Sequence, residues 1–442
     1  MLSCALLLGL ITCTSCLALP IGPDVDLNID YFQDYDTHGQ RTLEYIRSKL
    51  DVKTLPPIRS FPLKEEEKTL GKGEIPQYVL DHCPLVHLYT EEKYLPYDIS
   101  EFVKNFHLEH RNHTVIHGSG LTLDYLSSVA QDENIDDRNT FMTSDTDFSE
   151  DPDWLTGKFN KPDLVTGKIK NAPAVLVVVD KGNGWVDAYW FYFYSFNLGP
   201  FVMGHGPYGN HIGDWEHSLT RFYKGVPVFV WMSAHGGGGA YYYDALEKSE
   251  GDERKPIIFS ARGTHANYPS TGQHPHDLPF GILSDFTDRG ALWDPAQNYL
   301  GYVWDGFQIR TVSNQSKADN SKELEYGAGW LSFKGHWGDD KLAPNDPRQR
   351  WSPWEWKYIE GPTGPMTKHL SRSGLCQRAK WWNPSGRCEP KHFMTIGKGF
   401  ESEPGVMCAN LWGWVKPDLL RWALDQLTWG GGLCFLMNLI WG

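Results

Sequence analysis

Short apolar runs separated by turn-forming residues make up most of the chain from Tyr78 onward. Runs rich in β-branched and aromatic side chains predict β-strands. Six runs have this character: 172–180, 185–196, 215–223, 226–233, 256–260 and 302–311. The run 185–196 (WVDAYWFYFYSF) is apolar on both faces, so we expect it at the centre of a sheet. Lys224-Gly225 separates two of the runs and predicts a tight hairpin turn.

Helical patterns are few in comparison. The clearest one spans 417–429, and a shorter one spans 37–50 with Asp36 or Thr37 as its N-cap. The 44 glycines and 28 prolines supply many turns and disfavour a helical bundle. Short strands joined by such turns predict a mainly β fold, an antiparallel β-sandwich with long loops and a few peripheral helices, formed as one large domain over 76–425.

The two ends of the chain differ in composition from its middle. Residues 1–18 are apolar and uncharged and are soon followed by Pro20 and polar residues, which favours a cleaved signal peptide over a retained anchor. We expect 19–75 to be an extension and linker, and 426–442 to be an apolar tail. The leader predicts a secreted or vacuolar protein, on whose surface the sequons at Asn112 and Asn314 would be glycosylated.

Cysteine usage agrees with an oxidising route. Three of the eight cysteines leave with the signal peptide, and four of the remaining five lie after residue 370. This distribution predicts a C-terminal segment stapled by disulfides. Cys376–Cys388 is the simplest pair by sequence distance, although the connectivity stays open.

The charge balance restricts the kind of partner. The chain has 55 acidic and 41 basic residues, a formal net charge of −14. Nucleic-acid binders need a basic face, so a nucleic-acid partner is excluded. Attraction to anionic lipid is disfavoured as well, which limits membrane contact to a peripheral one. A neutral polar lipid headgroup or a glycan remains compatible with this surface.

The segment 210–217 (NHIGDWEH) carries the strongest chemical signal. Asp214 and Glu216 are two residues apart, so both carboxylates point to one face of a strand. His211 lies three residues before Asp214, where a turn would bring its imidazole beside them. Two carboxylates and one imidazole suit Ca²⁺, Mg²⁺ or Mn²⁺ better than a thiolate-type zinc site. The alternative is a strand end whose charges are solvated or paired with arginine.

Two further histidines, His235 and His265, stand in loops that follow apolar strands. His235 would complete the metal shell or bind an anionic group, and the glycine run 236–239 would let a ligand approach the backbone. His265 would be a partner of the metal ligands or an acid/base group. His217 and Trp215 alternate to the opposite strand face and are expected in the core.

Several motifs, in order along the chain, resemble the vacuolar protein sorting-associated protein 62 family, its fungal branch most closely. They lie at 83–96, 213–217, 233–236, 263–266, and 333–338 with 361–365. The resemblance runs from about 78 to about 422, which is most of the mature chain. The family name records a trafficking phenotype and implies a link to vacuolar protein sorting rather than a chemistry.

Residues 185–240 also have a distant likeness to the necrosis- and ethylene-inducing peptide-like toxins. The Gly-His-Arg-His-Asp-Trp-Glu signature of those toxins lies on a β-sandwich and holds a divalent metal. His211, Asp214 and Glu216 align with its three ligands. Gly213 replaces its second histidine, and Asn197 stands where the toxins have an upstream aspartate ligand. The likeness implies a shared sandwich and cation site rather than toxicity.

Two functions of different kinds fit these features. The first is a non-catalytic protein of the secretory pathway that binds a divalent cation and, through it, a polar lipid headgroup or a glycan. The alternative is a metal-dependent hydrolase with His235 or His265 as acid/base. The chain has neither a Gly-x-Ser-x-Gly elbow nor a His-Glu-x-x-His pair, so we favour binding over catalysis.

Overall fold

The structure is a computed structural model that describes nine ranges of the chain. These are 52–59, 61–71, 75–201, 206–276, 283–312, 327–353, 355–376, 390–392 and 418–428. The predicted helix 37–50, the signal peptide, Asn314 and the cysteines 388, 408 and 434 lie outside them. Within the described ranges, no helix combines the length and the apolar content needed to cross a bilayer.

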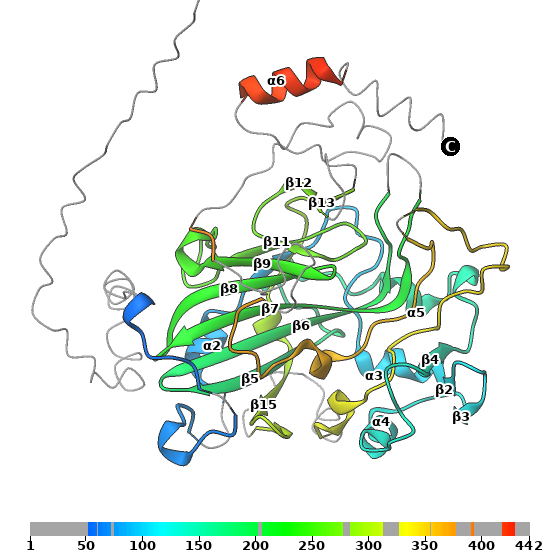
Figure 1. Cartoon of the computed structure of the whole chain (residues 1–442), viewed down its shortest axis with the longest axis horizontal. Coiled ribbons are helices and arrows are strands. Elements are labelled where there is room, and N and C mark those ends of the chain that lie inside the picture. The colour runs from blue at the N-terminus through cyan, green and yellow to red at the C-terminus, as the bar shows by residue number, and fades with distance from the viewer. Residues whose placement is uncertain are drawn as a thin grey trace, which may run out of the picture.

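The largest sheet has seven strands in the order β16-β15-β5-β6-β7-β8-β9 and runs across the molecule (Figure 1). Its strands are β5 Ala174–Gly182, β6 Trp185–Asn197, β7 His211–Tyr223, β8 Val226–Ala234, β9 Gly237–Tyr242, β15 Tyr299–Trp304 and β16 Ile309–Thr311. Neighbours are antiparallel except β5 and β15, which are parallel. β6 is the fourth strand and is buried along its whole length, which confirms the central position predicted for 185–196.

Smaller sheets and short helices surround this sheet. A four-stranded sheet has the order β11-β10-β1-β14, a three-stranded sheet the order β3-β2-β4, and β12 pairs with β13. Their strands are β1 Leu85–His87, β2 Phe106–His110, β3 Val115–His117, β4 Thr140–Ser144, β10 Ile257–Ser260, β11 Asn267–Tyr268, β12 Gly272–Pro275, β13 Ser284–Thr287 and β14 Leu292–Trp293. The α-helices are α2 Gln77–Asp81, α3 Ile99–Phe102, α4 Leu123–Val129, α5 Asp153–Thr156 and α6 Asp418–Leu427. The 3₁₀ turns are η1 Val52–Thr54, η2 Glu65–Glu67, η3 Val103–Asn105, η4 Phe148–Glu150, η5 Tyr243–Ala245, η7 Pro295–Gln297, η9 Gly329–Ser332 and η10 Pro365–Lys368.

Both faces of the seven-stranded sheet are covered by apolar side chains. On one face, Phe193 and Trp215 pack with Trp337 and with residues of β2 and β4. On the other face, Trp190 and Tyr192 belong to a cluster that includes β1 and β14. Alternate residues of β6 therefore enter two different cores, which is why its sequence is apolar at almost every position.

The prediction of a mainly β, predominantly antiparallel fold with few helices is confirmed, and two local predictions need correction. The run 302–311 forms the hairpin β15–β16 rather than one strand. Asp305 turns the chain by accepting hydrogen bonds from the backbone of Phe307 and Gln308. The glycine run after His235 is not a long loop, since 237–239 already belong to β9. The hairpin at Lys224-Gly225 is confirmed, with positive φ at both residues.

Candidate functional site

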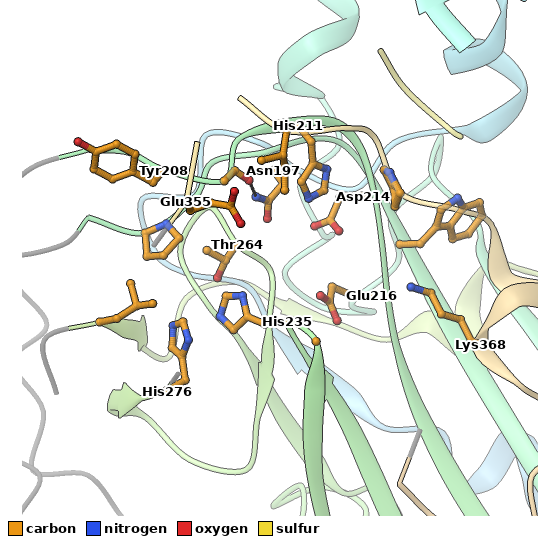
Figure 2. Close-up of a pocket in the computed structure, with 17 residues that line it drawn as sticks. Asn197, Tyr208, His211, Asp214, Glu216, His235, Thr264, His276, Glu355 and Lys368 are labelled. Carbon is orange, nitrogen blue, oxygen red and sulfur yellow. Dashed lines mark hydrogen bonds between the residues drawn. The ribbon is translucent and has the colours of Figure 1, made fainter. Parts of the chain in front are cut away.

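A cavity of about 500 Å³ lies where β6 and β8 end and β7 begins, and the predicted site residues gather around it (Figure 2). His211, Asp214, Glu216 and His235 line it. His265 lies behind its wall, in contact with Asp214. The turn predicted between His211 and Asp214 needs correction, because His211 is already the first residue of β7.

β7 presents the two carboxylates on one face, as the spacing predicts. Asp214 and Glu216 stand opposite Tyr194 and Tyr192 of β6. The intervening Trp215 enters the apolar core with 2% of its surface exposed. His217 follows the same alternation, is 1% exposed and stacks on Phe191, so its predicted core position is confirmed.

His211 is held in one orientation by its own strand. Its Nδ1–H donates to the backbone carbonyl of Gly213 at 2.7 Å. A carbonyl can only accept, so Nδ1 carries the proton and Nε2 keeps its lone pair. Burial holds the pKa of His211 below its ordinary value, against the opposing charge of Asp214. The neutral tautomer with a bare Nε2 is the form in which histidine binds metals.

Asp214 is held by His265. Oδ2 of the carboxylate accepts from Nδ1 of His265 at 2.9 Å, and Nε2 of the same ring donates to the carbonyl of Tyr94 at 2.9 Å. Burial opposes charge on this imidazole, but its hydrogen bond to Asp214 and the nearby carboxylate of Glu92, whose Oε1 lies 3.7 Å from Nε2, prevail and raise its pKa to about 10. His265 is fully buried and both of its ring nitrogens are engaged. This geometry makes it a positioning residue for Asp214 rather than an acid/base in the cavity.

Glu216 is held by Ser233 of β8, whose hydroxyl donates to Oε2 of the carboxylate. Burial, and after it the nearby charge of Asp214, raises the pKa of Glu216 well above its ordinary value. The ammonium of Lys368, from η10, lies on the same side of the cavity (Figure 2) and acts against this shift. The arginine pairing considered for these carboxylates is not present among the described residues, and the cations near them are His265 and Lys368.

The three predicted ligands share a wall of the cavity but do not form a closed cage. In the described part of the chain, no hydrogen bond engages Nε2 of His211, Oδ1 of Asp214 or Oε1 of Glu216. The ligand atoms of these three residues do not all lie within 4.8 Å of one another. Another group of side chains around the cavity, described below, does have its ligand atoms this close together. Trans ligands of Ca²⁺ lie roughly 4.8 Å apart, so one ion would have to draw these side chains inward or use water as an additional ligand.

Asn197 adds a further oxygen to this wall. It stands opposite His211 in the β6–β7 register and lines the cavity. Its Nδ2 donates to the carbonyl of Gly209 at 2.9 Å, which fixes the orientation of the amide. The amide oxygen of Asn197 is neutral, so it adds an acceptor to this wall without adding charge.

A second polar group on the opposite wall was only partly predicted. His235, in the tight turn between β8 and β9, brings Nε2 to 2.6 Å from Oδ2 of Asp285 on β13. His276, just after β12, stacks on His235 with ring centroids 3.9 Å apart. Sequence reasoning missed His276 and the role of Asp285. The segment 273–276 (QHPH) was the available signal, because it places two histidines on one short strand end.

Comparisons of the sequence with known proteins point to one family. The sequence profile described as vacuolar protein sorting-associated protein 62 matches residues 71–338. Vacuolar protein sorting-associated protein 62 of Saccharomyces cerevisiae is 48% identical over 421 residues, 89% of this chain and 88% of that protein. The putative vacuolar protein sorting-associated protein TDA6 of the same yeast is 46% identical over 432 residues, 90% of each chain.

Solved structures show a much weaker likeness. NLPPya in complex with mannosamine is 10% identical with a TM-score of 0.24 and covers 58% of this chain and 82% of that one. The Necrosis and Ethylene inducing Protein 2 from the causal agent of cocoa's Witches Broom disease is 10% identical, with a TM-score of 0.24 over 56% of this chain and 82% of that one. Scores this low carry no weight for function.

Proposed function

The chain belongs to the vacuolar protein sorting-associated protein 62 family, and we propose that it is a secretory-pathway member that binds a divalent cation at His211, Asp214 and Glu216 and, through the cation, a polar lipid headgroup or a glycan. One observation carries the proposal. Each of the three side chains is oriented through one polar atom by a neighbour and keeps its other ligand atom for the cavity. Metal ligands are supported in this way by their surrounding hydrogen bonds.

The donor set decides the class of ion. Two carboxylates, one imidazole and the amide oxygen of Asn197 form an oxygen-rich set, which suits Ca²⁺, Mg²⁺ or Mn²⁺. A bound cation needs Glu216 ionised although its surroundings favour the protonated form, so binding releases a proton and weakens in acid. The cavity of about 500 Å³ leaves room for a sugar or a headgroup to contribute hydroxyl or phosphate oxygens to the same ion.

We expect the cation to stabilise the fold measurably. An ion present at about a hundred times its Kd raises the free energy of unfolding by about 2.7 kcal/mol. Titrating Ca²⁺, Mg²⁺ or Mn²⁺ into chelator-treated protein should raise the thermal midpoint, and the increase should vanish in the double variant Asp214→Asn/Glu216→Gln.

The matched control is the double variant Glu91→Gln/Glu133→Gln, which removes two exposed carboxylates that do not line the cavity. It should keep the full response. The comparison uses the difference between chelated and cation-loaded protein, so a loss of intrinsic stability in the site variant does not obscure it. An equal cation response in both double variants would refute the site.

The polar ligand is tested on the same proteins. The wild-type protein should bind to glycan arrays or to neutral-headgroup vesicles when the cation is present. This binding should be lost when chelator is added and in the Asp214→Asn/Glu216→Gln variant. Binding that is unaffected by chelator would separate the ligand from the ion and overturn this part of the proposal.

A metal-dependent hydrolase remains the alternative, and one observation favours it. His235 faces the cavity and pairs with Asp285, so an imidazole–carboxylate pair stands across from the proposed ion. His265 is the weaker candidate because both of its nitrogens are engaged. Turnover of an ester, phosphate or glycoside panel that disappears in His235→Ala would establish the enzyme, and no turnover would leave the binding function.

The secretory route has its own test. Asn112 is exposed in the turn between β2 and β3, where an oligosaccharide transferase can reach it. We expect the protein from a eukaryotic host to lose apparent mass after endoglycosidase treatment, with part of that loss absent in Asn112→Gln. A mass unchanged by the enzyme would argue against entry into the secretory pathway.

A further inference from the structure

We propose that His235, His276 and Asp285 form a second metal site, separate from the first and selective for a zinc-like ion, whose open coordination position faces the same cavity. Among the described residues, these three form the group whose ligand atoms are close enough together to bind one metal ion, with all three atoms within 4.8 Å of one another. His235 and His276 line the cavity (Figure 2). The carboxylate of Asp285 approaches both imidazoles.

The distances suit a small tetrahedral ion. Nε2 of His235 is 2.6 Å from Oδ2 of Asp285, and Nε2 of His276 is 3.7 Å from Oδ1 of the same carboxylate. For bonds of about 2.0–2.1 Å, tetrahedral geometry separates two ligand atoms by roughly 3.3 Å. The observed distances bracket this value, so an ion can be accommodated by small side-chain movements.

The carboxylate of Asp285 is oriented by hydrogen bonds from two hydroxyl groups, which are themselves poor ligands for the ion. Thr264 donates to its Oδ1 at 2.9 Å, and the hydroxyl of Tyr268 donates to its Oδ2 at 2.7 Å. Asp285 is 2% exposed, so its carboxylate has lost its contact with water. Its hydrogen-bond partners must therefore compensate the free-energy cost of burying the charge. Such hydrogen bonds to a ligating carboxylate are the usual support of a metal site.

The backbone also fixes His235. It lies in the two-residue turn between β8 and β9 with φ of 52°, a conformation that is uncommon for a residue with a side chain. The preceding strand pairs in register up to Ala234, so the turn aims the imidazole at β13.

The ligand set differs from that of the first site and takes a different ion. Two imidazoles and one carboxylate match the three protein ligands of zinc sites that leave a fourth position for water or a ligand. An oxygen-preferring ion such as Ca²⁺ would gain a single carboxylate here. The cavity would then contain two ions of different class, and a ligand between the two walls would contact both. His235 would act as a ligand and not as a base.

The experiment uses the full chain, freed of metal with chelator. We expect about one equivalent of Zn²⁺ to bind tightly, and Co²⁺ in its place to give the intense visible absorption of a tetrahedral complex. Both signals should be lost in His235→Gln and in His276→Gln. Tyr268→Phe removes only a supporting hydrogen bond and should weaken Zn²⁺ binding about 10- to 100-fold.

Two controls establish that the zinc signal comes from this group of residues. His113→Gln removes an exposed histidine that does not line the cavity, and the variant should bind zinc as the wild type does. Asp214→Asn/Glu216→Gln should keep the zinc equivalent while losing its response to Ca²⁺, Mg²⁺ or Mn²⁺, so either site can fail alone.

Near-ultraviolet circular dichroism of each metal-free variant establishes that it is folded. Absence of the tetrahedral Co²⁺ band in wild type would overturn the proposal. Zinc binding that survives in a folded His276→Gln variant would overturn it as well.

Discussion

Gly213→Ala is expected to destabilise the protein by about 2–5 kcal/mol. Gly213 has φ of +67°, where an L-residue costs about 1–2 kcal/mol. A Cβ at this position would lie 1.9 Å from the carbonyl oxygen of Trp337, a contact that only backbone movement can relieve. Overpacking of this kind costs about 1–3 kcal/mol more. Denaturant unfolding measures the sum, and the cation response should fall as well, because the adjacent Asp214 would move.

Gly251→Ala is the matched control, since a Cβ there has no neighbour within 4 Å. It should change the free energy of unfolding by less than about 0.5 kcal/mol. The backbone segment around Gly213 is also in close contact with two glycines from later motifs of the chain. A Cβ on Gly338 would lie 2.0 Å from the carbonyl oxygen of Ile212, and one on Gly361 would lie 2.6 Å from Cα of Gly338. Wild-type stability in Gly213→Ala would show that this backbone crossing is looser than the structure has it.

The sequence predicts the central sheet well because its signals are local. Apolar runs rich in β-branched and aromatic residues, together with the Lys224-Gly225 turn, locate β5 to β8 with ends that differ from the predicted ones by at most four residues. Predictions are wrong where a short polar turn lies inside an apolar run, as at Asp305. They are also wrong where glycine serves packing: at Gly238, a Cβ would collide with the ring of Trp231 and the carbonyl of Met232. A glycine run therefore looks like a loop although it is the start of β9.

The candidate site also has a part that the sequence predicts and a part that it does not predict. Asp214 and Glu216 were predictable because the strand period places both carboxylates on one face. His211, three residues before Asp214, is out of phase with that period, and the positive φ of Gly213 interrupts the regular strand between them. The supports of the two carboxylates come from elsewhere in the chain: Ser233 from β8 and His265 from the loop before β11. These contacts depend on how strands pair across the fold. Periodicity gives no information on such pairing.

Asp187→Asn is expected to destabilise the protein by about 3–5 kcal/mol, because it leaves buried cations without their counter-ion. Asp187 is fully buried on β6 and stands opposite Arg221 in the β6–β7 register. Its oxygens accept from Nε of Arg221 at 2.7 Å and from Nη2 at 2.8 Å, and Nζ of Lys181 lies 3.6 Å away. Burial, opposed by the charge of Asp187, lowers the pKa of Lys181 to about 8, so this ammonium depends on the carboxylate to remain charged.

The cluster also connects the sheet to the segment that follows η10. Nζ of Lys181 donates to the carbonyls of Leu370 and Arg372, and Nη1 of Arg221 donates to the carbonyl of Ser373. This segment begins just after Lys368 on the cavity wall, so loss of Asp187 should loosen the site as well as the core.

Glu101→Gln, which breaks the exposed pair with Lys104, is the control and should cost at most about 0.5 kcal/mol. Urea unfolding of both variants with and without 1 M salt decides the matter, since salt screens a surface pair but not a buried one (Debye length about 3 Å at 1 M). A similar small loss in both variants would mean that the cations around Asp187 are solvated or discharge at little cost, and that the segment after η10 is held by its apolar contacts alone.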